Sequence, residues 1–386
     1  MDDPRRNRRR EQQRRVHRQR RLTAAVIAVV LVAVVAALAL RGGGSSSKAT
    51  ATAAESSNSQ AAAVSPPAQP IADAGPVKVA AVGDTNMGSL PYGLPSDGGA
   101  SLFSQVKPLL TGDIVMGNLE GTLSSGGGSK CGSNSTACYA FHTPPSYARW
   151  LKDAGFTVMN LANNHALDYG RVGLADTLAA SRRYGLPVIG AGADVAGAYT
   201  PYRATVRGVR VAFLAATDVL DTFAIPIWPA TAARAGLASV KDPGLLLDAV
   251  RRARADSDVV VVDLHWGVEL HSCPTPRQQQ LARLLTAAGA DVVVGSHAHV
   301  LGPNVRTGRT AVHYGLGNFV FYADGGAAAE SGVYTVTVDS GGVLATGWTP
   351  AVIRGGRPQL LTGSAARAAA SREAALAGRC GLGPIG

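Results

Sequence analysis

Seven side chains of metal-ligand type stand just past the ends of segments that read as β-strands. They are Asp84, Glu120, Asn164, His165, His265, His297 and His299. Carboxylate, amide and imidazole groups form an oxygen and nitrogen donor set that suits divalent ions of the Mn, Fe, Zn or Mg class rather than soft copper. In open α/β sheets, sites form beyond the carboxyl ends of the strands. The pattern therefore predicts that these side chains meet at one rim and hold one or two divalent metal ions.

The pair His297-x-His299 is the sharpest single signal in this set. Alternating residues of an extended segment point to the same side, so both imidazoles can reach one ion. The other runs also have simpler explanations. Residues 163–165 could cap the helix that follows them, and Asp84 or Asn118-x-Glu120 could belong to ordinary turns. The prediction of a metal centre therefore depends on the shared position of these residues at strand ends.

Alternating strand and helix signals would bring these residues together. Short β-branched runs predict strands at 77–82, 114–116, 156–161, 188–189, 209–215, 259–264 and 291–294. Helices are predicted between them, at 101–111, 144–154, 169–184, 245–255 and 278–288. This alternation predicts a parallel sheet covered by helices. Short strands and turns across 311–361 predict antiparallel β-structure that completes or faces the sheet, so the expected fold class is α/β, a two-sheet sandwich flanked by helices.

The positive charge of the chain is concentrated at its start. The 386 residues carry a formal net charge of +11, and residues 1–21 contribute +7 of it, because ten Arg stand there against Asp2, Asp3 and Glu11. The rest of the chain therefore carries only +4. A nucleic-acid-binding protein needs a basic folded face, so this distribution predicts no nucleic-acid partner.

A membrane anchor is predicted at 22–40, because these residues contain no charge. At ~1.5 Å per residue such a helix spans about 28 Å, close to the hydrocarbon thickness of a bilayer. Arginines are more numerous before it than after it, so the positive-inside rule places the basic tail (1–21) in the cytoplasm and the body outside. The alternative is a signal peptide cleaved near 37–39, which would make the protein secreted.

The remaining chain divides into three predicted parts. Residues 41–75 are rich in Gly, Ser and Pro and predict a disordered linker. A globular domain is expected at 76–362 and a C-terminal tail at 363–386. The four cysteines form no C-x-x-C pair, and outside the cytoplasm their even number favours disulfides. Cys131 and Cys138 could close a small loop, and Cys273 with Cys380 would then tie the tail to the body, although three connectivities are possible.

Six sequence runs, taken together and in this order, resemble the CapA family of bacterial capsule and poly-γ-glutamate synthesis proteins. They are Gly83-Asp84, Asn118-Leu119-Glu120, ANNHALDYG at 162–170, HWGVEL at 265–270, GSHAHV at 295–300 and YGLGNFVF at 314–321. The resemblance covers roughly residues 77–355. That family is similar to the calcineurin-like metallophosphoesterases, which implies a metallophosphatase-like sandwich for this chain.

The resemblance also implies roles for individual residues. Asp84 and His299 would bind a first metal ion, Glu120 would bridge two ions, and Asn164, His265 and His297 would bind the second. His165 would be the acid near the leaving group, and three further motif residues would bind substrate, namely Asn118, Glu269 and Asn318. The chain departs from the phosphoesterase pattern in one place, because Asp84-Thr85-Asn86 replaces Asp-x-His. This loss of an imidazole favours a single, tightly held ion.

Two functions follow from these expectations. The first is a divalent-metal hydrolase, anchored in the membrane, that acts in making, exporting or releasing an anionic envelope polymer such as poly-γ-glutamate. The second is a non-catalytic, polymer-binding subunit that works with polymer synthase or export subunits. An adhesive or signalling ectodomain would have no use for so many ligand-type residues at strand ends. The chain contains no evident nucleotide-binding glycine-rich loop, so an ATP-driven ligase activity is not expected.

Overall fold

The computed structural model describes residues 75–88, 94–132, 138–323 and 325–384. These residues belong to one compact unit, Gln69–Gly386. The predicted basic tail, membrane anchor and almost all of the predicted linker lie outside the described residues. Within the described ranges, none of the helices has the length and apolar character that a membrane span requires.

The first sheet has the strand order β18-β17-β16-β1-β2-β5-β6, with β15 paired to β1. Its strands are β1 (Val77–Thr85), β2 (Ile114–Leu119), β5 (Val158–Asn160), β6 (Val188–Ile189), β15 (Asn318–Val320), β16 (Glu330–Asp339), β17 (Gly342–Arg354) and β18 (Arg357–Leu360). Strands β1, β2, β5 and β6 run parallel. Strands β16, β17 and β18 extend the sheet antiparallel beyond β1, so the late part of the chain completes this sheet.

The second sheet has the strand order β13-β14-β12-β11-β9-β8. Its strands are β8 (Tyr202–Val206), β9 (Val209–Thr217), β11 (Val259–Trp266), β12 (Val292–His297), β13 (Asn304–Thr307) and β14 (Thr310–His313). The four inner strands are parallel, and β8 and β13 form antiparallel edges. Two short pairs complete the β-structure, β3 (Thr122–Leu123) with β4 (His142–Thr143) and β7 (Ala191–Gly192) with β10 (Gly236–Leu237).

The two sheets pack against each other through one apolar layer. Val79 of β1 and Val336 of β16 belong to the same buried cluster as Val261 of β11. The alternate residues Val260 and Val262 belong to a different cluster on the other face of β11. Because successive side chains alternate between faces, a strand buried on both faces is apolar at every position. This is why the sequence showed unbroken β-branched runs, and the predicted α/β class is confirmed.

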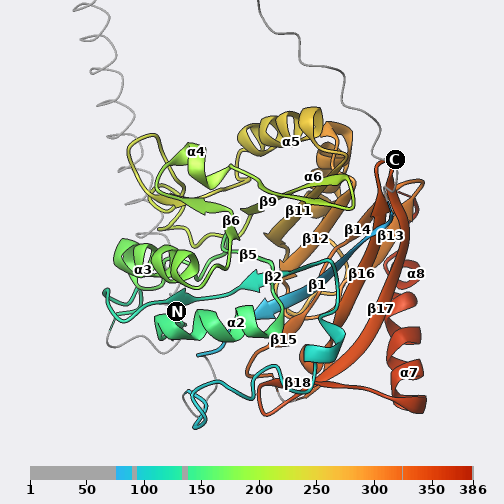
Figure 1. Cartoon of the computed structure of the whole chain (residues 1–386), viewed down its shortest axis with the longest axis horizontal. Helices are drawn as coiled ribbons and strands as arrows, with labels where there is room; N and C mark the ends of the chain where they lie inside the picture. Colours follow the sequence, from blue (N-terminus) through green and yellow to red (C-terminus); the bar gives the residue numbers. More distant parts are fainter. Residues whose placement is uncertain (1–74, 89–93, 133–137, 324, 385–386) are drawn as a thin grey trace, which may run out of the picture. The chain divides into compact units, whose positions relative to one another are not determined.

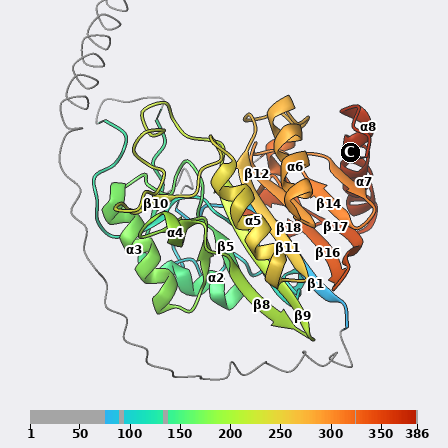
Figure 2. The same cartoon turned by 90° about the horizontal axis from the view of Figure 1, so that it is seen from above.

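Helices cover the outer faces of both sheets. The first sheet is covered by α2 (Ala148–Ala154) and α3 (Gly170–Arg183), and the second by α5 (Gly244–Asp256) and α6 (Pro276–Ala288) (Figure 1). Figure 2 shows α5 and α6 lying along the face of the second sheet, with the short helix α4 (Val195–Ala198) on the side of α3.

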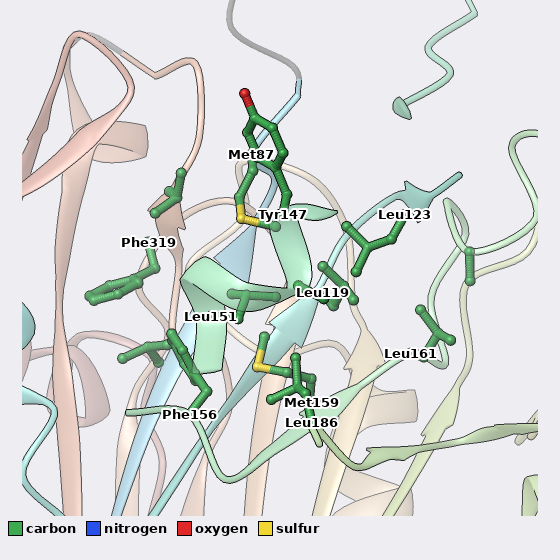
Figure 3. Packing of buried hydrophobic residues seen from close by; sticks show 14 of the residues in the cluster. Met87, Leu119, Leu123, Tyr147, Leu151, Phe156, Met159, Leu161, Leu186 and Phe319 are labelled. Atoms are coloured by element: carbon green, nitrogen blue, oxygen red, sulfur yellow. The ribbon is translucent and has the colours of Figure 1, made fainter. Parts of the chain in front are cut away.

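The apolar cluster outside the first sheet is visible in Figure 3. Leu151 of α2 packs there with Phe156 and Met159, near Leu119 at the end of β2. All four side chains are at most 2% exposed. Burying such side chains contributes about 1.5–3 kcal/mol each, so this cluster fixes the position of the strand ends that carry the polar residues.

Local signals set the ends of α6. Thr275 accepts a hydrogen bond from the main-chain N–H of Gln278, and the Gln278 side chain accepts one from the N–H of Thr275, which forms a capping box. Pro276 opens the helix, where its missing N–H is harmless. Gly289 closes it in the left-handed conformation, at φ 111°.

One predicted helix is wrong. Residues 101–111 form turns and a single 3₁₀ turn, Lys107–Leu109, instead of an α-helix. Pro108 lies inside this stretch and lacks the N–H that a helix interior requires.

Both expected disulfides are present. Cys131 pairs with Cys138, and Cys273 pairs with Cys380. The segment predicted as a C-terminal tail contains α7 (Gly363–Ala374) and α8 (Leu376–Arg379), and α7 packs against β17. The second disulfide therefore ties these helices to the loop that precedes α6.

Candidate metal centre

The carboxyl ends of strands from both sheets meet at one polar centre. Asp84 in β1, Asn118 in β2 and His265 in β11 are each the next-to-last residue of their strand, and His297 ends β12. Asn118 Nδ2 donates to Asp84 Oδ1 at 2.8 Å and lies 3.2 Å from His265 Nδ1. The main-chain N–H of His297 donates to Asp84 Oδ2 at 3.1 Å. The structure therefore brings together residues separated by up to 213 positions.

Asp84, Glu120 and His299 form the most enclosed group of this centre. Their ligand atoms all lie within 4.8 Å of one another. His299 Nδ1 is 3.2 Å from Asp84 Oδ2, and His299 Nε2 is 3.8 Å from Glu120 Oε1. Asn318 Oδ1 lies 2.8 Å from His299 Nδ1 and orients the ring. The group thus combines two carboxylates and one imidazole.

The carboxylate of Glu120 fits a cation. Among the described residues, neither of its oxygens has a hydrogen-bond partner, although the side chain is buried. Burial and the nearby Asp84 carboxylate raise the pKa of Glu120 well above its ordinary value. A buried carboxylate without hydrogen bonds is costly, so a divalent ion between these oxygens would offset both its burial and its repulsion from Asp84.

The charges around His299 favour a positive group at the same place. Burial alone would lower the pKa of His299, but Glu120 and Asp84 raise that pKa to about 10. Burial also opposes ionisation of Asp84, yet its hydrogen bond and charge interaction with His299 hold the pKa of Asp84 below its ordinary value. The two carboxylates therefore favour a positive charge between them, and a divalent cation would supply that charge.

A second group of ligand atoms lies beside the first. His265 Nε2 is 2.7 Å from Asn164 Oδ1. Burial lowers the pKa of His265 well below its ordinary value, and burial with the charge of His299 lowers the pKa of His297 to about 3. His297 Nδ1 is buried and, within the described ranges, has no hydrogen-bond partner. Both rings are thus held neutral, the form in which imidazole binds metal.

The two histidines of the H-x-H run reach the centre through an unusual backbone. His297 has φ 91° and His299 has φ 56°, both in the left-handed region. Such conformations cost about 1–3 kcal/mol each for residues other than glycine and gather at functional sites. The expectation that strand alternation aligns the two rings is wrong, because the chain turns at this point and β12 ends at His297.

His165 is held in place by an acidic partner on one of its two ring nitrogens. Its Nδ1 lies 2.7 Å from Asp168 Oδ2, and Asp168 Oδ1 is 2.9 Å from Lys130 Nζ. This contact leaves His165 Nε2 free toward Glu120, whose Oε1 is 3.7 Å away. Burial lowers the pKa of His165, although Asp168 works in the opposite direction. The ring also packs against Phe141 in a tilted arrangement, with 4.2 Å between the ring centroids.

A cavity opens beside His165. Its volume is about 430 Å³, and its wall is formed by Lys130, Cys138, Tyr139, Asn164, His165, Asp221, Phe223 and Glu269. A larger cavity, of about 540 Å³, is lined by residues such as Leu178 and Tyr202 and has no His, Asp, Glu or Cys in its wall. The smaller cavity is therefore the one that adjoins the candidate metal centre, because its wall contains residues of that centre.

All ten residues singled out from the sequence lie at or beside this centre, but their side chains are used differently. Asn118 and Asn318 are buried and bonded to other residues of the centre, and Glu269 is exposed at the cavity. Their role toward substrate stays a prediction. Asn86 offers an amide oxygen in place of the missing imidazole, and this oxygen accepts the N–H of Gly88 at 3.1 Å.

Sequence reasoning missed three supporting residues. Asn163 Nδ2 donates to Asn118 Oδ1 at 3.0 Å and to Leu119 O at 2.8 Å, which fixes the loop before His165. Asp168 and Lys130 complete the chain behind His165. The spacing of Asp168 three residues after His165 was a usable signal. No sequence signal pointed to Lys130, because only the folded chain brings its loop to the site.

The chain matches a known family over most of the domain. Residues 78–323 match the model of the family described as "Bacterial capsule synthesis protein PGA_cap", and the chain belongs to this family. It is 36% identical over 245 residues to the PGA biosynthesis protein CapA of Bacillus subtilis (strain 168), and the match covers 62% of each chain. The predicted resemblance to the CapA family is thus confirmed.

Two further relatives are similar. The chain is 37% identical over 216 residues to the capsule biosynthesis protein CapA of Bacillus anthracis, which covers 55% of this chain and 51% of that protein. It is 30% identical over 200 residues to a probable polyglutamine synthesis accessory protein of Mycobacterium tuberculosis, covering 50% of this chain and 52% of that one. The matches thus span from 51% to 62% of the lengths of these three relatives.

Among solved structures, the chain is similar to a putative 5'-nucleotidase from Staphylococcus aureus in complex with alpha-ketoglutarate. The TM-score is 0.46 at 17% identity, and the match covers 77% of this chain and 58% of that one. A hypothetical protein from Thermus thermophilus is similar with a TM-score of 0.44, 17% identity and coverage of 71% and 98%. Both likenesses are distant, and no function is carried over from them.

Proposed function

We propose that this chain is a divalent-metal-dependent hydrolase that acts in the biosynthesis, export or release of an anionic envelope polymer such as poly-γ-glutamate. The observation that supports it most is the group of Asp84, Glu120 and His299, whose ligand atoms lie within 4.8 Å of one another beside His165. A protein that only bound a polymer could use the same ion to recognise carboxylates, but it would not need a histidine positioned by an aspartate beside that ion.

The residues of the centre have two proposed roles, metal binding and proton donation. Asp84, Glu120, Asn164, His265, His297 and His299 would hold one or two ions of the Mn, Fe, Zn or Mg class. A bound divalent ion supplies positive charge that polarises the scissile bond. His165 keeps Nδ1 on Asp168, so Nε2 is the atom that can give a proton to the leaving group. Burial lowers the pKa of His165, and its hydrogen bond to Asp168 opposes that shift.

The polymer is proposed from family membership. The names of two relatives refer to PGA or capsule biosynthesis, which supports an anionic envelope polymer as the material on which this chain acts. The cavity of about 430 Å³ can receive a short segment of such a chain. The bond cleaved would be a phosphoester or an amide within it, and polymer synthase or export subunits would be its partners.

The site of action is proposed to be outside the cytoplasm. Residues 22–40 would anchor the chain in the cell membrane with the N-terminus in the cytoplasm, or would direct secretion if they are cleaved. The two disulfides support an oxidising compartment.

A second candidate is a non-catalytic, polymer-binding subunit of a synthesis or export complex. The observation that favours it is Asn86, which stands where the phosphoesterase pattern has a metal-binding histidine and whose oxygen is already bonded to Gly88. In that case any bound ion would recognise carboxylates of the polymer rather than drive a reaction.

The replacement His165→Ala separates the two candidates, with His271→Ala as the matched control because His271 is exposed on a nearby loop. Each protein is assayed for metal content by elemental analysis, for folding by circular dichroism, and for turnover of poly-γ-glutamate, γ-glutamyl peptides and chromogenic phosphoesters. The hydrolase predicts that His165→Ala keeps its metal and fold but loses about 10²- to 10⁴-fold in turnover.

The opposite outcome is equally informative. Unchanged turnover in His165→Ala would remove the assigned acid. A folded wild-type protein that binds no divalent ion would remove the hydrolase altogether and favour the polymer-binding subunit.

A further inference from the structure

We propose that Glu269 is a metal ligand, and that Glu269, His297 and His299 form an open three-ligand cation position at the wall of the cavity. This inference rests on the metal-dependent function proposed above and assigns a residue to the ion itself rather than to substrate. Its ligand atoms lie within 4.8 Å of one another, as do those of the Asp84 group. His299 belongs to both groups, so Glu269 approaches the cation region from a second side.

The side chain of Glu269 is free to bind. It is exposed at the cavity, and among the described residues no hydrogen bond or ion pair involves its carboxylate. On the other side, His297 Nδ1 is buried without a hydrogen-bond partner in the described chain. Two imidazoles and one carboxylate with open positions form a donor set that suits divalent Fe, Mn or Zn.

The backbone around Glu269 is held in a strained shape. Leu270 has φ 59° although it is not glycine and 67% of its surface is exposed. Left-handed backbone costs about 1–3 kcal/mol at such a residue, and an exposed leucine regains little of this by packing. An exposed loop with no structural or functional constraint would adopt an unstrained backbone. The strain at Leu270 therefore indicates that the position of this turn is constrained.

The same turn is fastened to the two histidines. The N–H of Leu270 donates to the main-chain oxygen of Ala298 at 2.8 Å. Ala298 stands between His297 and His299, which both have left-handed backbone. One hydrogen bond therefore links the three strained positions and sets Glu269 beside both rings.

The proposal also accounts for the departure at Asn86. The phosphoesterase pattern places an imidazole there, whereas Asn86 offers only an amide oxygen, which accepts the N–H of Gly88. A carboxylate that arrives from the loop after β11 would restore the lost ligand with an added negative charge. The ion would then lie at the cavity wall, close to His165 and within reach of a substrate.

The test is divalent-ion binding by the full-length chain, with Glu269→Gln compared against Asp221→Asn. Asp221 lines the same cavity and is half exposed but lies outside both ligand groups, so its replacement removes the same charge without removing a ligand. Mn²⁺ and Zn²⁺ affinities are measured by calorimetry, and Co²⁺ is used for its visible absorption. We expect Glu269→Gln to weaken binding about 10- to 100-fold and to change the Co²⁺ spectrum, and Asp221→Asn to bind within about twofold of wild type with an unchanged spectrum.

Melting without added metal checks for damage to the fold. In the presence of chelator, Glu269→Gln should have the same melting temperature as wild type. Added metal should raise the melting temperature of wild type but not that of Glu269→Gln. Equal affinity and an identical Co²⁺ spectrum in Glu269→Gln would overturn this proposal alone, since the Asp84 group would still hold an ion. If Glu269→Gln binds metal more weakly but the wild type shows no turnover, the assignment of Glu269 as a metal ligand is supported and the proposed hydrolase function is overturned. A wild type that binds none of the three ions would overturn both.

Discussion

At the scale of single residues, the centre depends on close backbone approaches as much as on its ligands. Asp84 follows Gly83, and the N–H of Asp84 donates to the main-chain oxygen of Gly317 at 2.9 Å. A Cβ atom built on Gly83 would overlap that same oxygen. Gly83 therefore allows β1 to lie against the segment that leads into Asn318, and Asn318 in turn orients His299.

The replacement Gly83→Ala should destabilise the protein strongly. The added methyl group meets main-chain atoms, which cannot move aside as a side chain can, so we expect a loss of about 3 kcal/mol in the free energy of unfolding. For a domain of this size that lowers the melting temperature by roughly 5 °C. Thermal melting followed by circular dichroism measures it.

Gly347→Ala is the matched control. Gly347 lies in a strand, is exposed, and a Cβ atom added to it would have no other atom within 4 Å. Its replacement should leave the melting temperature nearly unchanged or raise it slightly. If Gly83→Ala has the same melting temperature as wild type, β1 and the Gly317 segment can separate without cost. The claim that their close approach positions Asp84 would then be wrong.

At the scale of elements, two disulfides of very different span cross-link the domain. Cys131–Cys138 spans 7 positions and closes the loop that carries Lys130 to the cavity. Cys273–Cys380 spans 107 positions and ties the C-terminal helices α7 and α8 to the body. A cross-link stabilises more when it closes a longer loop of the unfolded chain.

Removing the two disulfides separately should therefore have unequal effects. The double variant Cys273→Ser/Cys380→Ser is expected to lose about 5 kcal/mol in the free energy of unfolding, and Cys131→Ser/Cys138→Ser about 2.5 kcal/mol. Urea unfolding of both variants beside the oxidised wild type gives these values. Equal losses would mean that strain or residual structure, and not loop closure, sets the contribution of each bridge.

At the scale of the whole molecule, the domain and the proposed membrane anchor occupy separate parts of the sequence. The centre is built entirely from residues between Asp84 and Asn318, inside the unit Gln69–Gly386. The proposed anchor at 22–40 precedes that unit and contributes no residue to the centre. Attachment and chemistry should therefore be separable by experiment.

The full-length chain should stay with membranes after an alkaline carbonate wash and keep its own N-terminus. Nineteen uncharged residues, 22–40, bury enough apolar surface for stable insertion. Intact mass measurement of the membrane fraction checks this, with the fragment 71–386 behind a cleavable export signal as the soluble control. A chain found in the medium and beginning near residue 40 would contradict the anchor and establish a cleaved signal peptide.

The sequence by itself determined the class of fold and the place of the chemistry. Strands such as 259–264 and helices such as 278–288 were readable because apolar periodicity and end signals are local properties of the chain. The positions of Asp84 and His297 at strand ends were readable for the same reason. Parallel strands bring their carboxyl ends to one edge of their own sheet, so the place of each residue at a sheet edge followed from its position along the chain. The helix predicted at 101–111 failed where Pro108 interrupts it.

Only the tertiary structure decided how these residues work together. Lys130 reaches Asp168, Leu270 bonds to Ala298, and Asp84 meets the N–H of a residue 213 positions away. Such contacts depend on the pairing of distant strands and on single left-handed backbone angles, which residue type and spacing do not encode. The physical reason is that secondary structure arises from neighbours along the chain, whereas a metal centre arises from side chains that meet only when both sheets have packed.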